Sequence, residues 1–451
     1  MQPVRRAPGF TLLASLALSA GALSAADPVT LKAHDNLNEW GWPGHALSNG
    51  LVTVGVVPAI GGRIMQYDLG KHAFLWVNPA ELGKVHAPAD DGQWHNFGGF
   101  KTWVAPQQAW RHGMGGWPPP PTLDRGAWTI QTGPADESSA VLTLESPVET
   151  LEGWQAKGLK LARRCTLTRG STRLRVEQAV TNAGQHPQVV SLWDVTQMAG
   201  CHPGVDDPDQ FWVYIPKHPR SAYGPRGFMS YATDPDSLPG LSQYHDFAGD
   251  GLIGVQYLRR GGKLGADSQA GWIAAVDERD GFTYVKRFAV KADAAYPEGP
   301  NTVAVYTHSD PAAPYVEVEV MSPLAELEPG KGFAFTIDWY ATRIDGPILA
   351  VTDVAAVKHR LAVTSKDKRH RVTGAVGVFI EGTAALVGLP RKVDGKRVAL
   401  ASYYCSPLQP LIIDADLAVP PEIGTLAVEI ADGEGHVVGI ADQVDLPSIK
   451  P

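Results

Sequence analysis

Short apolar segments separated by turn residues recur along the whole chain. Val, Thr, Leu and aromatic residues make up most of these segments, and 48 Gly and 36 Pro interrupt the chain. β-Branched and aromatic residues suit a pleated surface, whereas Gly and Pro favour turns. Long stretches of helical periodicity are hard to find. The pattern therefore predicts an all-β protein, built as a sandwich or a barrel.

Several segments alternate between polar and apolar residues, which indicates strands with one solvated face. We expect strands at 51–58, 63–68, 128–130, 140–145, 158–168, 173–182, 189–198, 252–258, 270–277, 282–290, 302–307, 315–320, 333–341, 372–380, 384–389, 397–404 and 425–430. Residues 353–360 are a candidate helix. Residues 201–251, rich in Pro, Gly and Asp, predict long loops over a sheet.

The first 26 residues have the pattern of a secretory signal peptide. Arg5 and Arg6 precede an apolar run, and Ser24-Ala25-Ala26 offers small residues for cleavage. The apolar run is too short to span a bilayer, and no second long apolar run follows. We therefore expect an exported protein, periplasmic or secreted, that has no membrane contact after cleavage.

Tryptophan usage divides the remaining chain. All thirteen Trp precede a turn at Asp345-Gly346-Pro347, and none follows it. We predict a large domain at 27–345, which carries the binding site. Residues 346–451 have the length and turn spacing of a small immunoglobulin-like accessory β-sandwich.

Charge and cysteine content limit the classes of partner. The formal net charge is −8, which argues against nucleic acid as a default partner. The three cysteines form no disulfide framework. Cys165 and Cys201 could pair in an oxidising compartment, or they could remain buried free thiols.

Residues 94–110 combine aromatic rings with amide and cationic groups around a Gly-Gly pair. Adjacent Gly98 and Gly99 permit positive φ and a close approach of the backbone. Rings beside polar groups suit a ligand with an apolar face and many hydroxyl groups, such as a sugar. The alternative is an aromatic core under a long loop, because Trp is largely buried on average. The predicted substrate-binding residues are Arg63, Trp94, Asn96, Trp103, Gln107, Trp110, Asp194 and Gln197.

Glu317 and Glu319 lie two residues apart on one face of a predicted strand. Neighbouring carboxylates repel each other, so they need cations, a metal ion or solvent. Sugar chemistry requires a carboxylate close to a matched acid or base. The candidate catalytic residues are Glu319 or Glu317 as the base, with Lys101 or His308 as the acid. The alternative is that both glutamates are structural and that His308 is a solvated loop residue.

Signatures of other enzyme classes are absent from the sequence. It contains no nucleophile elbow, phosphate-binding loop, paired-His zinc helix or CxxC motif. Asp206, Asp207 and Asp209 could bind Ca²⁺, but aspartates beside a proline are more often turn residues. We therefore expect no metal and no cofactor.

Four segments in order resemble the galactose-mutarotase-like superfamily. They are Gly61-Gly62-Arg63-Ile64, the segment from Asn96 to Trp103, the strand at 189–197, and the strand at 315–320. The Gly-Gly…Trp-x-Ala-Pro and Trp-Asp-Val-Thr-Gln segments look closest to an uncharacterised bacterial domain-of-unknown-function family within it. The resemblance implies a β-supersandwich with a sugar site on its concave face and a catalytic Glu on the closing strands.

The sequence also departs from the pattern of that superfamily. Mutarotases carry one His just before the Gly-Gly pair and another on the central strand. Phe97 precedes the pair here, and Trp193-Asp194 stands near the second position. Ring opening by a His acid and a Glu base is therefore not expected in its usual form. The fold also serves hydrolases, lyases and binding domains.

The leading hypothesis is an exported protein that binds or acts on a neutral saccharide, a small molecule or an oligosaccharide. The reaction would be that of a sugar epimerase, a glycoside hydrolase or a lyase. A second hypothesis is a non-catalytic envelope interaction protein, which predicts an exposed apolar patch in place of a polar cleft. A third is a metal-dependent hydrolase that uses the aspartates at 206–209.

Overall fold

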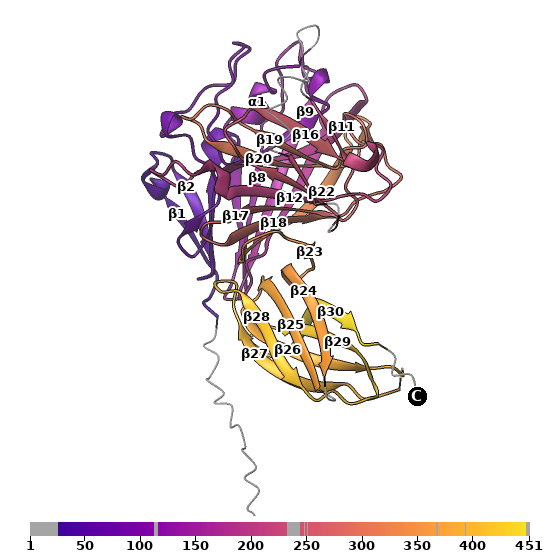
Figure 1. Ribbon diagram of the computed structural model, residues 1–451. Coiled ribbons are helices and arrows are strands. Elements are labelled where there is room, and N and C mark those ends of the chain that lie inside the picture. The colour runs from indigo at the N-terminus through magenta and orange to yellow at the C-terminus, as the bar shows by residue number, and fades with distance from the viewer. Residues whose placement is uncertain are drawn as a thin grey trace, which may run out of the picture.

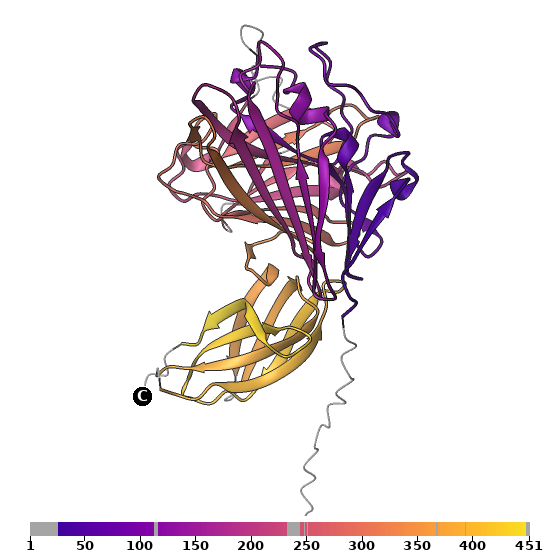
Figure 2. The same cartoon turned by 180° about the vertical axis from the view of Figure 1, so that it is seen from behind.

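The computed structural model describes residues 26–111, 116–231, 244–247, 249, 251–366, 369–392 and 394–447. Nearly all of the predicted signal peptide lies outside these residues. The regular structure is almost entirely antiparallel strand, which confirms the predicted all-β class. Figure 1 shows a large double-sheet domain with a smaller sandwich at one end, and Figure 2 shows the opposite side.

The first sheet of the large domain carries the candidate site. Its main path runs through β1 (Thr30–His34), β2 (Gly44–Ser48), β3 (Val52–Val57), β4 (Arg63–Leu69), β6 (Phe100–Ala105), β11 (Gln188–Ala199), β20 (Tyr315–Met321), β19 (Val303–Thr307), β16 (Gly262–Ala266) and β13 (Phe228–Ser230). Two short strands extend it, because β5 (His72–Ala73) pairs with β4 and β21 (Ala325–Leu327) pairs with β11.

The second sheet packs against the first. Its order is β14 (Tyr244–Phe247), β15 (Leu252–Gln256), β12 (Phe211–Pro216), β17 (Trp272–Asp277), β18 (Phe282–Phe288), β22 (Gly332–Arg343), β10 (Leu174–Asn182), β9 (Leu159–Thr168), β8 (Ser139–Glu145) and β7 (Thr129–Ala135). The helical segments are short: α1 (Pro121–Arg125) and the 3₁₀ turns η1 (Leu37–Glu39), η2 (Pro58–Ile60), η3 (Pro79–Glu81), η4 (Gln107–Ala109), η5 (Pro208–Gln210) and η6 (Gly224–Arg226). None of the helices that the structure describes has the length and apolar character needed to cross a bilayer.

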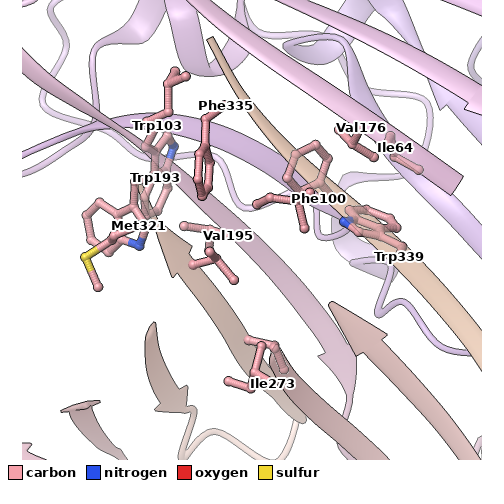
Figure 3. Packing of buried hydrophobic residues seen from close by; sticks show 14 of the residues in the cluster. Ile64, Phe100, Trp103, Val176, Trp193, Val195, Ile273, Met321, Phe335 and Trp339 are labelled. Carbon is pink, nitrogen blue, oxygen red and sulfur yellow. The ribbon is translucent and has the colours of Figure 1, made fainter. Parts of the chain in front are cut away.

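The core of the large domain lies between the two sheets. Phe100 of β6 meets Trp339 of β22 edge to face, with ring centroids 5.0 Å apart (Figure 3). Successive side chains along β6 point to opposite faces of the sheet. Phe100 and Thr102 point to the second sheet, so Lys101 and Trp103 point to the opposite face of the first sheet.

The small domain consists of two four-stranded sheets around a separate apolar core. One sheet contains β23 (Ala350–Val351), β24 (Ala355–Lys366), β25 (Arg369–Val378) and β28 (Leu411–Leu417), and the other contains β27 (Val398–Cys405), β26 (Gly382–Pro390), β29 (Ile423–Ala431) and β30 (Val437–Asp445). Tyr340 of the large domain stacks on Phe379 of the small domain at 4.4 Å. The two domains therefore share an apolar contact.

Two predictions about local structure are wrong. Residues 353–360 do not form a helix, since Ala355–Lys366 is strand β24 and pairs with β25. The start of β24 is buried, so tertiary pairing outweighs the modest helix propensity of Ala, Lys and Arg there. The segment 201–251 is not only loop, because it contributes β12, β13 and β14.

Cys165, Cys201 and Cys405 are free thiols.

Asp68 in β4 provides a test of stability against pH. Burial raises the pKa of its carboxyl group to about 6, although Gln66 donates a hydrogen bond to it at 2.6 Å. The folded chain therefore binds more protons than the unfolded chain between about pH 4 and 6. Stability from this group falls as the pH rises through that window, because the buried carboxyl must ionise.

Asp68→Asn is expected to raise the free energy of unfolding at pH 8 by up to about 3 kcal/mol and to change it little at pH 4. The asparagine carries no charge to bury at either pH. Urea unfolding followed by Trp fluorescence at the two pH values checks this. An equal effect of the substitution at both would contradict it.

Candidate functional site

Strand register gathers the polar side chains of the site on the outer face of the first sheet. Two neighbouring rows of side chains cross the central strands. One row consists of Gln197, Glu317, Tyr306 and Lys263, on β11, β20, β19 and β16. The next consists of Lys101, Val195 and Glu319, on β6, β11 and β20. Residues that are far apart in sequence thus become neighbours.

The Gly-Gly pair brings the chain into β6 at the correct angle. Gly98 and Gly99 both have positive φ, at 89° and 65°. A Cβ on Gly98 would lie 2.3 Å from the carbonyl oxygen of Trp76, and one on Gly99 would lie 2.6 Å from that of Ile64. Only glycine therefore fits this close approach, which sets the start of the strand that carries Lys101 and Trp103.

Glu317 is held between a cation and an amide. Its Oε1 accepts hydrogen bonds from Lys101 Nζ and from Gln197 Nε2, each at 3.0 Å. Lys101 is buried, and burial lowers the pKa of its ammonium group although Glu317 opposes the change. Lys101 Nζ also lies 4.7 Å from the ring centre of Trp103. The pair joins a carboxylate to a lysine whose proton is easier to release than usual.

Glu319 forms a second carboxylate–lysine pair, deeper in the sheet. Its Oε2 accepts a hydrogen bond from Trp193 Nε1 at 2.8 Å and lies 3.2 Å from Lys263 Nζ. Burial raises the pKa of Glu319. The side chain of Glu319 is 1% exposed, whereas that of Glu317 is 10% exposed. Glu317 is therefore the carboxylate that a ligand can reach.

A cavity of about 370 Å³ opens over these pairs. Its walls are mainly aromatic, with a carboxylate, a lysine and an amide among them. The lining residues are Trp94, Trp103, Gln107, Trp117, Trp193, Lys263, Tyr306, His308, Tyr315 and Glu317. The volume lies within the usual range of small-molecule sites.

His308 belongs to the wall of the cavity. Its ring stacks on Tyr315 at 4.7 Å, and its Nδ1 lies 3.1 Å from the Tyr306 hydroxyl. Burial lowers the pKa of the His308 imidazole. A neutral imidazole at this position can donate a hydrogen bond to a ligand hydroxyl group or accept one from it.

Two predicted binding residues lie in buried ion pairs away from the cavity. Arg63 pairs with Asp124 at 2.9 Å, and Asp124 also accepts a hydrogen bond from Trp103 Nε1 at 2.7 Å. Asp194 points between the sheets, where Lys286 and Gln178 donate hydrogen bonds to it. Both residues are 0% exposed. These contacts make Arg63 and Asp194 supports of the sheet, not lining residues of the cavity.

The remaining predicted residues occupy the edges of the site. Trp110 is buried behind the wall, and its Nε1 donates a hydrogen bond to the Val104 carbonyl. The Asn96 side chain accepts a hydrogen bond from the Gly98 N–H at 3.3 Å, which supports the turn before β6. Gln197 does not line the cavity, but its Nε2 donates a hydrogen bond to Glu317 Oε1 at 3.0 Å.

Asp206, Asp207 and Asp209, which the sequence offers as candidate Ca²⁺ ligands, belong to no group of metal-ligating side chains among the described residues. Asp206 pairs with Arg259 at 2.5 Å. Asp207 contacts Arg279 and His202. Asp206 and Asp207 have protein cations as partners, so the structure gives a Ca²⁺ site in this loop no support.

Sequence reasoning missed half of the cavity wall. The residues that it did not name for the site are Trp117, Trp193, Lys263, Tyr306 and Tyr315. Trp193 belongs to the segment 189–197 and Tyr315 to the segment 315–320, and the sequence motifs had already pointed to both segments. Lys263 carried no local signal, because only the pairing of β16 with β19 brings it beside Tyr306.

No protein-family model matches the sequence, and no curated protein matches it. Solved structures of similar fold were found. A putative aldose 1-epimerase from Klebsiella pneumoniae is 11% identical with a TM-score of 0.49, over 70% of this chain and 83% of that chain. A galactose mutarotase-like protein from Clostridium acetobutylicum is 11% identical with a TM-score of 0.45, over 70% of this chain and 99% of that chain.

A putative mutarotase from Salmonella typhimurium is 12% identical with a TM-score of 0.43, over 71% of this chain and 97% of that chain. The chain shares at most 12% of its residues with these three proteins, and all three TM-scores lie below 0.5. Its function must be inferred from its own site residues, because one fold serves many activities.

Proposed function

We propose that the protein binds a neutral saccharide in the cavity of the first sheet and that Glu317 is the acid–base group there. The observation that carries the proposal is the placement of Glu317. It is the more exposed of two paired carboxylates, and it lies in an aromatic cavity of about 370 Å³. Export to the periplasm or the medium is part of the proposal and rests on the signal-peptide pattern.

The chemistry of the wall suits a sugar. Trp94, Trp117 and Trp193 offer ring faces or edges to the apolar C–H face of a pyranose. Gln107 and Tyr306 supply groups that can hydrogen-bond to hydroxyls. Such a mixture of apolar surface and a few polar groups is typical of small-molecule sites.

Charge balance supports a neutral ligand. Lys101 pairs with Glu317, and Lys263 pairs with Glu319. The two positive and two negative charges offset each other, so a charged ligand would find no unmatched counter-charge in these four groups. A neutral hydroxyl-rich ligand needs none.

The same pairs supply an acid and a base. Glu317 can take a proton from a sugar hydroxyl and return it, and Lys101, which is buried 3.0 Å from Glu317 Oε1, can supply that carboxylate with a proton because burial lowers the lysine pKa. The reaction class that fits is proton transfer at a sugar hydroxyl, as in epimerisation of the anomeric carbon through ring opening and closure. Glu319 is less suited to act directly, since Trp193 and Lys263 cover its Oε2.

The interaction-protein alternative predicts an exposed apolar patch and no concave polar pocket. Trp103 and Trp110 are buried, and Trp94 and Trp117 line a cavity that contains Glu317 and Lys263. This arrangement favours the saccharide proposal over a flat protein-binding surface.

Trp117→Ala is expected to weaken saccharide binding about 10-fold, or about 1.4 kcal/mol. Trp117 is 43% exposed at the cavity, so its loss removes a stacking surface, together with ring contacts to Trp94, Trp103 and Trp110. Tyr404→Ala is the matched control, because Tyr404 is 53% exposed on the small domain. Thermal shifts with a panel of neutral mono- and oligosaccharides identify the ligand by mass action, and calorimetry then gives its Kd.

Equal Kd values for the parent chain and Trp117→Ala would place the ligand elsewhere. No thermal shift with any neutral saccharide at millimolar concentration would contradict the proposed function itself.

A further inference from the structure

A second cleft, of about 840 Å³, lies apart from the saccharide cavity and shares no lining residue with it. Two imidazoles and two carboxylates gather at one end of this cleft. They are His72, His202, Asp277 and Asp280. They come from β5 of the first sheet, from the segment after β11, and from the end of β17 and the turn that follows it in the second sheet.

The ligand atoms of His72, Asp277 and Asp280 lie within 4.8 Å of one another, and His202 lies beside both carboxylates. His202 Nε2 lies 2.7 Å from Asp277 Oδ2 and 3.3 Å from Asp280 Oδ2. His72 Nδ1 lies 3.9 Å from Asp277 Oδ2. Four ligands on a tetrahedral ion at about 2.0–2.2 Å stand about 3.4 Å apart. These three distances fall on both sides of that value, and an ion between the groups requires the contact between His202 and Asp277 to open.

Neighbouring groups already orient these side chains. Asp277 Oδ1 accepts hydrogen bonds from the N–H groups of Arg279 and Asp280, which leaves Oδ2 directed at the imidazoles. The ring of His72 stacks on Phe282 with centroids 4.1 Å apart. Both residues are therefore held before any ion binds.

The second nitrogen of His202 has the partner that metal-bound histidines usually have. His202 Nδ1 lies 2.7 Å from Asp207 Oδ2. A carboxylate on the far nitrogen fixes the tautomer and directs the other nitrogen to the metal. Arg279 in turn contacts Asp207 at 2.6 Å and offsets its charge.

We propose that His72, His202, Asp277 and Asp280 bind one Zn²⁺ ion that joins the two sheets of the large domain. Two imidazole nitrogens favour zinc over Ca²⁺ or Mg²⁺, which take oxygen ligands. Four protein ligands close the coordination sphere, so the ion has a structural role. The ion ties β5 to the turn after β17, and binding stabilises the folded chain by mass action.

The test uses the full chain after treatment with a chelator and dialysis. Titration with Zn²⁺ in a calorimeter is expected to show one ion per chain. His202→Ala is expected to weaken binding more than about 100-fold, and Asp207→Asn to weaken it about 10–100-fold. Asp280→Asn provides a second ligand variant that does not disturb the core, because this side chain is 48% exposed.

The matched control is the double variant His86→Ala/His95→Ala. These two histidines and Glu81 form a second group of suitable side chains among the described residues, besides that of His72, Asp277 and Asp280. Their rings stack in parallel at 3.5 Å, so their in-plane lone pairs do not converge on one point. The control is expected to bind Zn²⁺ as the parent does.

Co²⁺ provides an independent readout, because tetrahedral coordination gives it strong visible absorption. That absorption should appear in the parent chain and disappear in His202→Ala. Three results would each overturn the proposal: no bound Zn²⁺ at micromolar concentration, binding that survives both His202→Ala and Asp280→Asn, or binding lost in the His86/His95 control.

Discussion

Lys286→Met is expected to lower the free energy of unfolding of the large domain by about 3–5 kcal/mol. Lys286 and Asp194 are both 0% exposed and form an ion pair between the two sheets. Lys286 Nζ also donates a hydrogen bond to the Val318 carbonyl at 2.6 Å. The methionine keeps the length of the side chain but leaves Asp194 as a buried charge with only Gln178 as a close donor. An uncompensated buried charge carries a large penalty.

Urea unfolding followed by Trp fluorescence measures this effect. All thirteen Trp lie in the large domain, so the signal reports on that domain alone. Lys331→Met is the control, since Lys331 is exposed next to β22. Asp194→Asn/Lys286→Met should cost less than Lys286→Met, because the double variant removes both charges. A loss below about 1 kcal/mol for Lys286→Met would show that the pair does not hold the sheets as inferred.

Glu317→Gln is expected to lower kcat on the identified saccharide by about 10²–10⁴-fold, while Kd changes by less than about 10-fold. Glutamine keeps the shape of the side chain and can still accept hydrogen bonds from Lys101 and Gln197. It cannot take up a proton. The binding surface formed by the tryptophans remains in place.

NMR of the sugar anomers and epimers, together with product chromatography, measures turnover. Glu326→Gln is the matched control, because Glu326 is exposed on β21. A kcat for Glu317→Gln within about 2-fold of the parent would exclude the acid–base role. If the parent chain binds the sugar without converting it, the catalytic part of the proposal fails and the binding part stands.

Local sequence patterns predicted most of the fold because strands have a simple period. The alternation at 315–320 identified β20, and the Gly-Gly pair identified the tight entry into β6. The pattern failed at 353–360, where a segment with helix-forming residues becomes β24. Its partner β25 and the buried contact between the domains decide the outcome, and neither is visible in a short window of sequence.

The site was only partly predictable for a related reason. Residue type suggested Lys101 and Glu317, which the structure places 3.0 Å apart. Residue type could not separate Asp194 from these, although it lies on the opposite face of the same sheet. A strand position alone does not say which face is buried between two sheets.

Lys263 shows the limit most clearly. It became a site residue only through the register of β16, β19 and β20, which sets it in the row of Glu317. The same holds for the proposed zinc site, where His72 and Asp277 come from different sheets. Such groups depend on long-range pairing, which no local motif specifies.

A crystal structure of the full chain soaked with the saccharide that gives the largest thermal shift tests the central claim most directly. We expect the sugar in the cavity of the first sheet, with a hydroxyl within hydrogen-bond distance of Glu317 and its C–H face on Trp117, Trp94 or Trp193. A sugar bound at any other place, or no sugar in this cavity at saturating concentration, would contradict the assignment of the cavity as the saccharide site.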